Sequence, residues 1–480
     1  MIISRYLPFI KSLDKYSTEI IIKIILLISL YIAATAILKE SEILVVFLVS
    51  VCFIFLVLNI QTFPILSALV FLVPFQPIDS GFGSINMFLV YFLSGVVITK
   101  KIIRKEKLKE KTVADLPFLF ILLAYILSLA NINSGLKPHL MYLFAFISNI
   151  LIFYLIVSSV KTEKELYTLV YIMGFSSILV FLYCYLQMFA LGSHINVLGF
   201  EELRLREASH QLYGLNRVRG PFADAEIMCE YAVIQSLIQI FMFFHEKKTL
   251  KKYFWMTLLI LNITVLIATS TRAGIICETI GLIYFAFIFR KRFHLRKFLM
   301  VVPLIILIFY LGSIFLHTYT RSGYLFERLG STEIKAGSVI KNRGNWFLVF
   351  PYLKEHLFIG HGPRYDTPSN NLNYPHSLYI FLVYTMGLFG LISFLWLFLE
   401  LFKYSWKGLK LPNSNLFLWG MVAIFQIILV IFLIDEIKIE FLRWPDRNYQ
   451  HFIFFLFGLL VAAVNMVRAD RARIMTEMNK

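Results

Sequence analysis

The stretch PHSLYIFLVYTMGLFGL, residues 375–391, places a histidine directly before an apolar run without Lys, Arg, Asp or Glu. Apolar segments of about 18 or more residues predict membrane-spanning helices, and we expect one here over residues 376–402. The histidine closes a polar loop of 59 residues, 317–375. We therefore place His376 at the membrane surface, at a helix start whose dipole favours a neutral imidazole that can accept a proton. The alternative is a histidine that is merely interfacial.

The rest of the chain has the composition of a membrane protein. It is 59% hydrophobic and 16% charged, and it contains 48 phenylalanines. We expect an all-α polytopic membrane protein with about 12–14 transmembrane helices and two sizeable extracytoplasmic loops. The candidate spans are 20–38, 43–60, 63–77, 86–99, 116–130, 139–160, 166–191, 225–244, 253–268, 273–289, 298–316, 376–402, 416–434 and 449–467.

The distribution of Lys and Arg predicts the orientation, because positive residues are retained on the cytoplasmic side of short loops. With the N-terminus inside, the predicted cytoplasmic segments hold 28 of the 46 Lys and Arg residues. Both termini are then cytoplasmic. The expected regions are an N-terminal scaffold at 1–191, a first large outer loop at 192–224, central helices at 225–316, a second outer loop at 317–375, and C-terminal helices with a tail at 376–480.

Several function classes lose support from the composition. The net charge of +17 is explained by topology and by anionic lipid headgroups, so we do not expect nucleic-acid binding. The four cysteines lie inside predicted spans without CxxC spacing, and no P-loop, HExxH or GxSxG motif occurs. We therefore expect neither a disulfide framework nor a metal site, and neither nucleotide nor serine-based hydrolysis.

The loop 317–375 is unexpectedly basic for an outer segment. Seven Lys and Arg, among them Arg343 and Arg364, outnumber four Asp and Glu. An anionic ligand is the simplest explanation. We expect an amphipathic helix at 338–354 and a tight turn at IGHGP, residues 359–363, because two glycines and a proline permit or fix unusual dihedral angles.

The first outer loop, 192–224, leads into a helix that Asp224 is expected to cap. Two arginines end this loop, and two glutamates four residues apart share one face of the helix. A carboxylate inside a membrane span marks a functional site by default. In the structural alternative, the first glutamate is interfacial and the second pairs with an arginine. These candidate substrate-binding residues are Arg217, Arg219, Glu226 and Glu230.

The run TSTRAG, residues 269–274, is expected at an outer turn between two helices. It puts Arg272 at a helix start, where a cation opposes the helix dipole unless an anion is held between the guanidinium and the backbone N–H groups. In the alternative reading, Arg272 reaches lipid headgroups or pairs with Glu278.

Four motifs now stand in order: TSTRAG, NRGNW (342–346), EHLFIGHG (355–362) and the stretch at 375–391. Together they resemble the O-antigen ligase and O-antigen polymerase superfamily of bacterial membrane glycosyltransferases. The resemblance implies a GT-C-like fold, an active site on the outer face of the plasma membrane, and a glycan donor carried on undecaprenyl diphosphate. It implies no cofactor and no metal.

By this resemblance, Arg272 matches the arginine of a serine-arginine motif, with Thr271 where serine is usual. Arg343 matches the arginine of the large loop, and His376 matches the histidine at its end. These three are the expected catalytic residues. Arg219 resembles an arginine that precedes an earlier glycine-phenylalanine motif, and Arg364 is a further candidate ligand.

The expected reaction is a direct displacement. Neutral His376 acts as general base on the acceptor hydroxyl, which attacks the anomeric carbon of the lipid-linked sugar and inverts it. Arg272 and Arg343 stabilise charge on the departing diphosphate, because a planar guanidinium matches phosphate oxygens.

We expect a polymerase that joins undecaprenyl-diphosphate-linked repeat units into a surface polysaccharide. One rival is a ligase that transfers finished glycan to the lipid A core of lipopolysaccharide. A rival of another class is a flippase for lipid-linked oligosaccharides, although flippases generally have short loops on both faces. The expected partners are the lipid-linked donor, a glycan or lipid acceptor, the bilayer, a chain-length regulator and a flippase.

Overall fold

The structure, a computed structural model, describes the chain in segments. These are residues 61–75, 79–80, 83–103, 105, 111–132, 135–189, 206–207, 216–290, 292, 310–314, 318, 344–365, 375–411, 415–442 and 447–478. The spans expected at 20–38 and 43–60, and most of the span expected at 298–316, lie outside the described residues.

Helices dominate the described segments. They are α4 (Thr62–Leu72), α5 (Ile85–Ile103), α6 (Asp115–Ser128) with a 3-10 turn (Leu129–Asn131), α7 (Leu136–Ser159), α8 (Glu163–Phe189), α9 (Ala225–His245), α10 (Thr249–Ala268), α11 (Arg272–Phe289), α15 (Gly344–Leu353), α16 (Leu378–Leu409), α17 (Leu416–Asp435) and α18 (Arg447–Met478). The strands are two antiparallel pairs, β1 (Asp79–Ser80) with β2 (Gly83–Ser84) and β3 (Arg206–Glu207) with β4 (Asn216–Arg217).

Nine helices within the described segments are long and apolar enough to cross a membrane: α5, α7, α8, α9, α10, α11, α16, α17 and α18. Helices α4 and α6 are shorter but also apolar. The chain is therefore an all-α polytopic membrane protein, as the sequence predicts. Eleven of the expected spans have a helix at their place.

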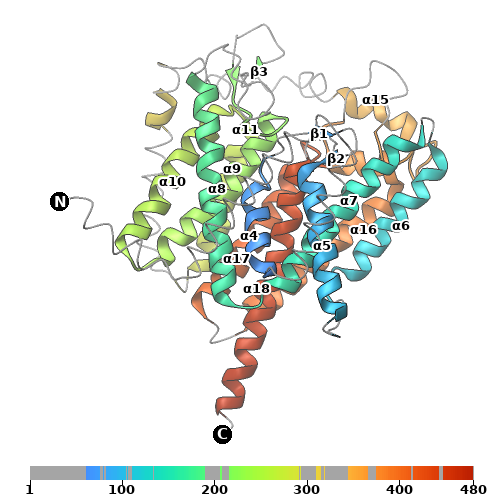
Figure 1. The fold of residues 1–480 in the computed structure, drawn as a ribbon. Coiled ribbons are helices and arrows are strands. Elements are labelled where there is room, and N and C mark those ends of the chain that lie inside the picture. The colour runs from blue at the N-terminus through green and yellow to red at the C-terminus, as the bar shows by residue number, and fades with distance from the viewer. Residues whose placement is uncertain are drawn as a thin grey trace, which may run out of the picture.

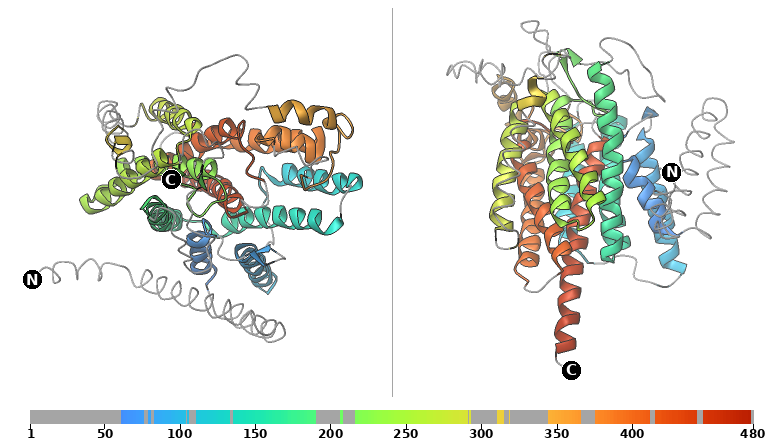
Figure 2. Two further views of the ribbon diagram at one scale, coloured as in Figure 1. Left: turned by 90° about the horizontal axis from the view of Figure 1, so that it is seen from above. Right: turned by 90° about the vertical axis from the view of Figure 1, so that its left-hand side faces the viewer.

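The helices stand roughly side by side (Figure 1). Strand β3 and helix α15 lie at one end of the bundle, which we call the outer end, and the C-terminal part of α18 projects from the opposite end (Figures 1 and 2). Helix α18 packs along α7 and α17, α9 along α10, and α16 along α6. This arrangement brings the N-terminal ends of α9, α11, α16 and α18 to the outer end.

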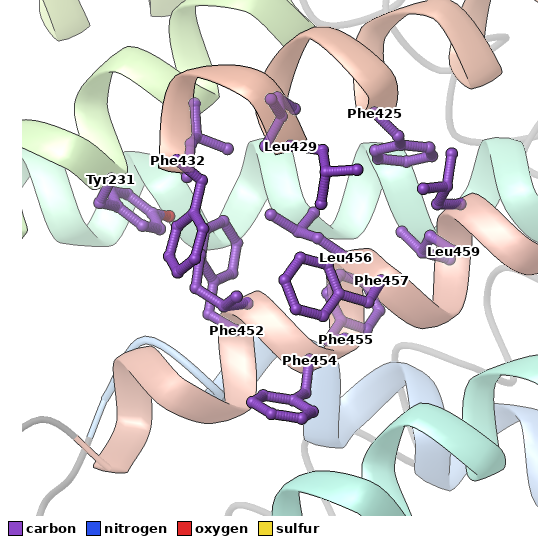
Figure 3. Packing of buried hydrophobic residues seen from close by; sticks show 14 of the residues in the cluster. Tyr231, Phe425, Leu429, Phe432, Phe452, Phe454, Phe455, Leu456, Phe457 and Leu459 are labelled. Carbon is purple, nitrogen blue, oxygen red and sulfur yellow. The ribbon is translucent and has the colours of Figure 1, made fainter. Parts of the chain in front are cut away.

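The core lies where α17 and α18 meet α9. Aromatic and leucine side chains of α17 and α18 point toward one another, and Tyr231 of α9 lies beside them (Figure 3). The ring centroids of Tyr231 and Phe452 are 4.9 Å apart, and Phe432 meets Phe457 edge to face at 6.1 Å. Such aromatic pairs add about 0.5–1.5 kcal/mol each beyond the area that they bury. Close packing of aromatic side chains therefore fixes α9, α17 and α18 relative to one another below their outer ends.

Candidate functional site

The TSTRAG turn forms the sharp reversal between α10 and α11 that the sequence predicts. Ser270 adopts a left-handed backbone conformation with φ of 50°, and Thr271 is extended. Helix α11 then begins at Arg272, whose side chain is exposed. The hydroxyl of Thr271 does not cap its own helix.

Arg217 holds this turn in place from the preceding loop. Its Nε donates to the carbonyl oxygen of Thr269 at 2.9 Å, and its Nη2 donates to Thr271 Oγ1 at 2.8 Å. Its Nη2 also lies 4.0 Å from Oε1 of Glu226. Arg217 thus joins the end of α10, the start of α11 and the first turn of α9.

We predict that Arg217→Met lowers glycan transfer by about tenfold to a hundredfold, the worth of one or two charge-assisted hydrogen bonds. Arg217 holds the turn at Arg272 partly by donating to the hydroxyl of Thr271, so Thr271→Val, which lacks that hydroxyl, should also lower transfer. Thr271→Ser is the matched control and should retain it. Transfer rates of purified variants at equal protein level measure the effect, and equal rates for Val and Ser would contradict it.

Arg219 lies on the turn that follows Arg217. Gln187 of α8 accepts hydrogen bonds from the backbone N–H groups of Arg219 at 3.3 Å and Gly220 at 2.9 Å. Gly220 has φ of 59°, and a Cβ added there would lie 2.6 Å from Sδ of Met228. The turn is therefore fixed against α8 and α9, with the Arg219 side chain half-buried at the outer end.

Helix α9 starts as predicted. Asp224 caps it by accepting a hydrogen bond from the Glu226 N–H at 3.2 Å. Glu226 is half-buried, and Glu230, one turn deeper, is 2% exposed. The two glutamates predicted from the sequence therefore extend from the surface into the bundle.

The segment after α17 completes this group of charges. A run as polar as residues 435–448 is by itself typical of an exposed turn, whereas the structure buries Asp435, Glu436 and Glu440 at 2%, 0% and 0% exposure. Lys438 Nζ lies 3.3 Å from Asp435 Oδ1. It also interacts electrostatically with Glu226 and Glu230 of α9. The segment returns into the bundle because Ile439, Phe441 and Leu442 are buried with it.

Two ionisable groups of this segment, Lys438 and Glu436, have strongly shifted pKa values. Burial alone would lower the pKa of Lys438, but the carboxylates of Asp435, Glu226 and Glu230 outweigh it and hold that pKa above its ordinary value. Burial, reinforced by repulsion from Glu230 and Asp435, raises the pKa of Glu436 well above its usual range. The charged lysine is thus matched by carboxylates, while Glu436 favours its neutral form.

We predict that Glu436→Gln stabilises the protein more as pH rises. A raised folded-state pKa means that the stability associated with protonated Glu436 is present at low pH and lost as pH rises through that pKa. Glutamine keeps the oxygen that accepts the Phe441 N–H at 3.2 Å and cannot ionise. Thermal unfolding at pH 5, 7 and 9 measures this, and a variant-to-wild-type difference independent of pH would contradict it.

Cys277 connects the acidic group, the buried carboxyls of Asp435, Glu436 and Glu440, to α11, the helix that begins at Arg272. Its Sγ donates to Asp435 Oδ1 at 3.2 Å, and it lies five residues beyond Arg272 on α11. Cys184 and Cys229 are likewise buried free thiols. Within the described segments, no group of three or more His, Cys, Asp or Glu residues is placed to hold a metal ion.

His376 lies just before α16 rather than at its first residue. Its backbone is left-handed, with φ of 46°, and its side chain is exposed. The Leu378 N–H, at the first position of α16, donates to the carbonyl oxygens of Glu436 at 2.9 Å and Ile439 at 3.0 Å. The segment that carries the acidic group therefore also caps the helix behind His376. A non-glycine residue in this conformation is a recognised mark of functional sites.

The IGHGP turn has the unusual dihedrals that the sequence predicts, with φ of 73° at Gly360 and 115° at Gly362. The sequence did not predict its partner. Helix α16 is broken at Gly387, where φ is 67° and ψ is −173°, and residues 357–362, here the insertion segment, pair with the break. Burial lowers the pKa of His361 in this segment, and its Nε2 lies 2.9 Å from the Tyr352 carbonyl oxygen.

The remaining predicted residues lie around the large loop. Arg364 is exposed, and its backbone N–H donates to His139 Nδ1 at 3.2 Å. The expected amphipathic helix appears in part as α15, which begins at Gly344. Arg343 lies outside the described residues.

The structure thus assembles most of the predicted residues into two neighbouring groups at the outer end. Arg217, Glu226 and Glu230 meet the turn of Arg272 and the 435–440 segment. The same segment caps α16 at Leu378, two residues after His376. Guanidinium groups suit the binding of an anionic leaving group, and an exposed imidazole suits the removal of a proton from an acceptor.

Comparison with known proteins identifies a related family. No curated protein matches the chain. Residues 257–395 match the family model described as O-antigen ligase. This range contains the turn of Arg272, the insertion segment, His376 and the break at Gly387. The match supports the membership of this multi-pass membrane protein in the O-antigen ligase and polymerase superfamily.

Proposed function

We propose that the protein transfers glycan from a polyprenyl diphosphate carrier to a sugar hydroxyl on the outer face of the bacterial plasma membrane, with both termini in the cytoplasm. The observation that carries the proposal is the turn at α11. There, an exposed Arg272 begins α11, the hydroxyl of Thr271 does not cap that helix, and Arg217 braces the turn. Such a helix start, together with a guanidinium, suits the phosphate groups of the donor.

The chemistry is a single displacement. His376 takes the proton of the acceptor hydroxyl as its oxygen forms a bond to the anomeric carbon. The bond between that carbon and the phosphate oxygen breaks, and the undecaprenyl diphosphate leaves with its charge stabilised by Arg272, by Arg343 and by Arg219. The anomeric configuration inverts. No divalent metal takes part, so transfer is expected to continue in EDTA.

The acceptor that we assign is the non-reducing end of a lipid-linked repeat unit, which makes the protein a polymerase of a surface polysaccharide such as O-antigen. The basic outer loop and the outer arginines suit a donor and an acceptor that both carry diphosphate. A chain-length regulator and a flippase that delivers repeat units are the proposed partners.

A gel ladder of surface polysaccharide tests the assignment. A deletion strain is complemented with wild-type protein or with Arg272→Ala at equal membrane level. If the protein is a polymerase, the deletion strain carries only single repeat units on the final acceptor. Wild-type protein then restores the ladder, and Arg272→Ala does not. Long polymer that accumulates on the lipid carrier identifies a ligase instead. Repeat units retained on the cytoplasmic face identify a flippase.

A further inference from the structure

The break in α16 frees backbone groups, and the insertion segment pairs with four of them. An unbroken helix would join the Leu388 N–H to the Tyr384 carbonyl and the Phe389 N–H to the Thr385 carbonyl. In the structure, His361 N–H donates to the Tyr384 carbonyl at 2.8 Å and Gly362 N–H to the Thr385 carbonyl at 3.1 Å. The N–H groups of residues 388 and 389 donate to the carbonyls of residues 357 and 358 at 2.8 and 3.2 Å.

This exchange is what makes a broken helix tolerable in an apolar setting. An unpaired backbone group removed from water is strongly unfavourable, and such irregular backbone occurs in membrane proteins only where protein or water covers it. The insertion segment supplies two donors and two acceptors in the order that the break requires.

Two glycines make the close approach geometrically feasible. A Cβ added to Gly360 would lie 2.4 Å from the carbonyl carbon and oxygen of Thr385. A Cβ added to Gly387 would lie 2.2 Å from the carbonyl carbon and oxygen of Phe358. The dihedral angles of Gly387, φ 67° and ψ −173°, also fall in a region that is essentially restricted to glycine. We call the pairing of residues 357–362 with residues 384–389 of α16 the junction. Each glycine thus faces the backbone of the segment opposite it across the junction.

Aromatic residues of the loop also pack against the outer part of α16, which follows His376 in the chain. The His361 ring stacks on Tyr384 at 4.5 Å, and Tyr365 packs against Tyr384 at 4.6 Å and Phe381 at 6.2 Å. These aromatic residues of α16 lie in its outer part, Leu378–Met386. The other fixed point of that outer part is the Leu378 N–H, capped by residues 436 and 439.

We propose that residues 357–362 are a positioning segment that sets the direction of the outer part of α16, and thereby the place of His376, with Gly360 and Gly387 as positioning residues. The effect on catalysis rests on the function proposed above. The junction itself does not. It joins residues 357–362 of the large outer loop to residues 384–389 of α16, so the helix that follows His376 is held against the same loop that carries the basic residues.

The segment and the helix compete for the same four groups. If residues 357–362 withdraw, residues 384 and 385 are correctly spaced to pair again with residues 388 and 389 within α16. A variant that favours a continuous helix should therefore release the segment without unfolding α16. Gly387→Ala is that variant, because alanine is excluded from the native dihedral angles and stabilises a helix relative to glycine.

The test is hydrogen exchange, read by mass spectrometry on the full protein in lipid nanodiscs, combined with transfer kinetics. In Gly387→Ala the amides of His361 and Gly362 should lose protection, while those of Leu388 and Phe389 stay protected by α16 itself. We expect kcat to fall about a hundredfold, the cost of a displacement of roughly 1 Å in a catalytic group. The KM for the lipid-linked donor should change less than threefold, because Arg217, Arg219 and Arg272 lie on other elements.

Gly408→Ala is the matched control. Gly408 is in the same helix with an ordinary helical backbone, and an added Cβ would meet methyl groups of Val464 at 3.3 Å and of Val422 at 3.6 Å, with no backbone atom among its nearest neighbours. Exchange and kcat should both stay at wild-type values. Gly360→Ala is the second variant, since its strain falls on the segment and leaves the sequence of α16 intact. It should expose His361 and Gly362 in the same way.

Unchanged protection of His361 and Gly362 in both glycine variants would overturn the proposal. Loss of that protection with an unchanged kcat would overturn the positioning role. If the wild-type protein transfers no glycan at all, the proposed function fails, and the exchange pattern still decides whether the junction exists.

Discussion

His376→Asn is expected to lower the rate of glycan transfer by about a hundredfold to ten-thousandfold, the usual contribution of a general base. Asparagine is the informative replacement, because it tolerates a left-handed backbone and His376 has φ of 46°. The variant therefore removes the imidazole without adding the strain that alanine would bring. The rate is measured with purified protein and lipid-linked repeat units as donor and acceptor.

His356 provides the control for this substitution. It is a half-buried histidine of the same loop whose ring packs against His361 at 4.8 Å, and it has no part in the proposed displacement. His356→Asn should retain transfer to within a few-fold. If His376→Asn transfers glycan as fast as His356→Asn, His376 is not the base.

Arg272→Ala is expected to lower transfer by about a hundredfold to a thousandfold, as does the removal of one preorganised group that stabilises charge in a transition state. Arg272→Lys keeps the charge but loses the planar fork that fits phosphate oxygens. It should fall between alanine and wild type. Initial rates at saturating acceptor, with the donor concentration varied, separate weaker donor binding from slower chemistry.

The opposite end of the same helix supplies the matched control. Arg290 follows α11 at the other end of the bundle, where its guanidinium lies 4.6 Å from the Phe287 ring. Arg290→Ala should leave transfer unchanged. If Arg272→Ala and Arg290→Ala reach equal membrane levels and both transfer glycan at the wild-type rate, the role given to Arg272 is wrong.

The sequence predicted those features that depend on nearby residues. Helix α9 covers residues 225–245, where the apolar run predicted 225–244, because lipid-spanning segments must be long and apolar. Asp224 caps α9 as predicted, since an N-cap needs only a side-chain oxygen two residues before the N–H that it accepts. Arg272 starts α11, and two glycines form the turn at 360–362, for equally local reasons.

Features that depend on distant partners were not predicted. The run TMGLFGL suggests an unbroken helix, and the break at Gly387 exists because residues 357–362 return to pair with it. Glu436 and Lys438 look like residues of an exposed polar turn. They are buried because their partners Glu226 and Glu230 lie on α9, some two hundred residues earlier in the chain.

The central claim is that a sugar leaves its diphosphate carrier at this site. It is tested most directly with purified protein in nanodiscs that contain the lipid-linked repeat unit, by following the release of undecaprenyl diphosphate and the anomeric configuration of the product. The account predicts one carrier diphosphate released for each new glycosidic bond, with inversion, and a release slowed by about a hundredfold to ten-thousandfold in His376→Asn. Movement of intact lipid-linked oligosaccharide across the membrane without release of diphosphate, or a product with retained configuration, would contradict it.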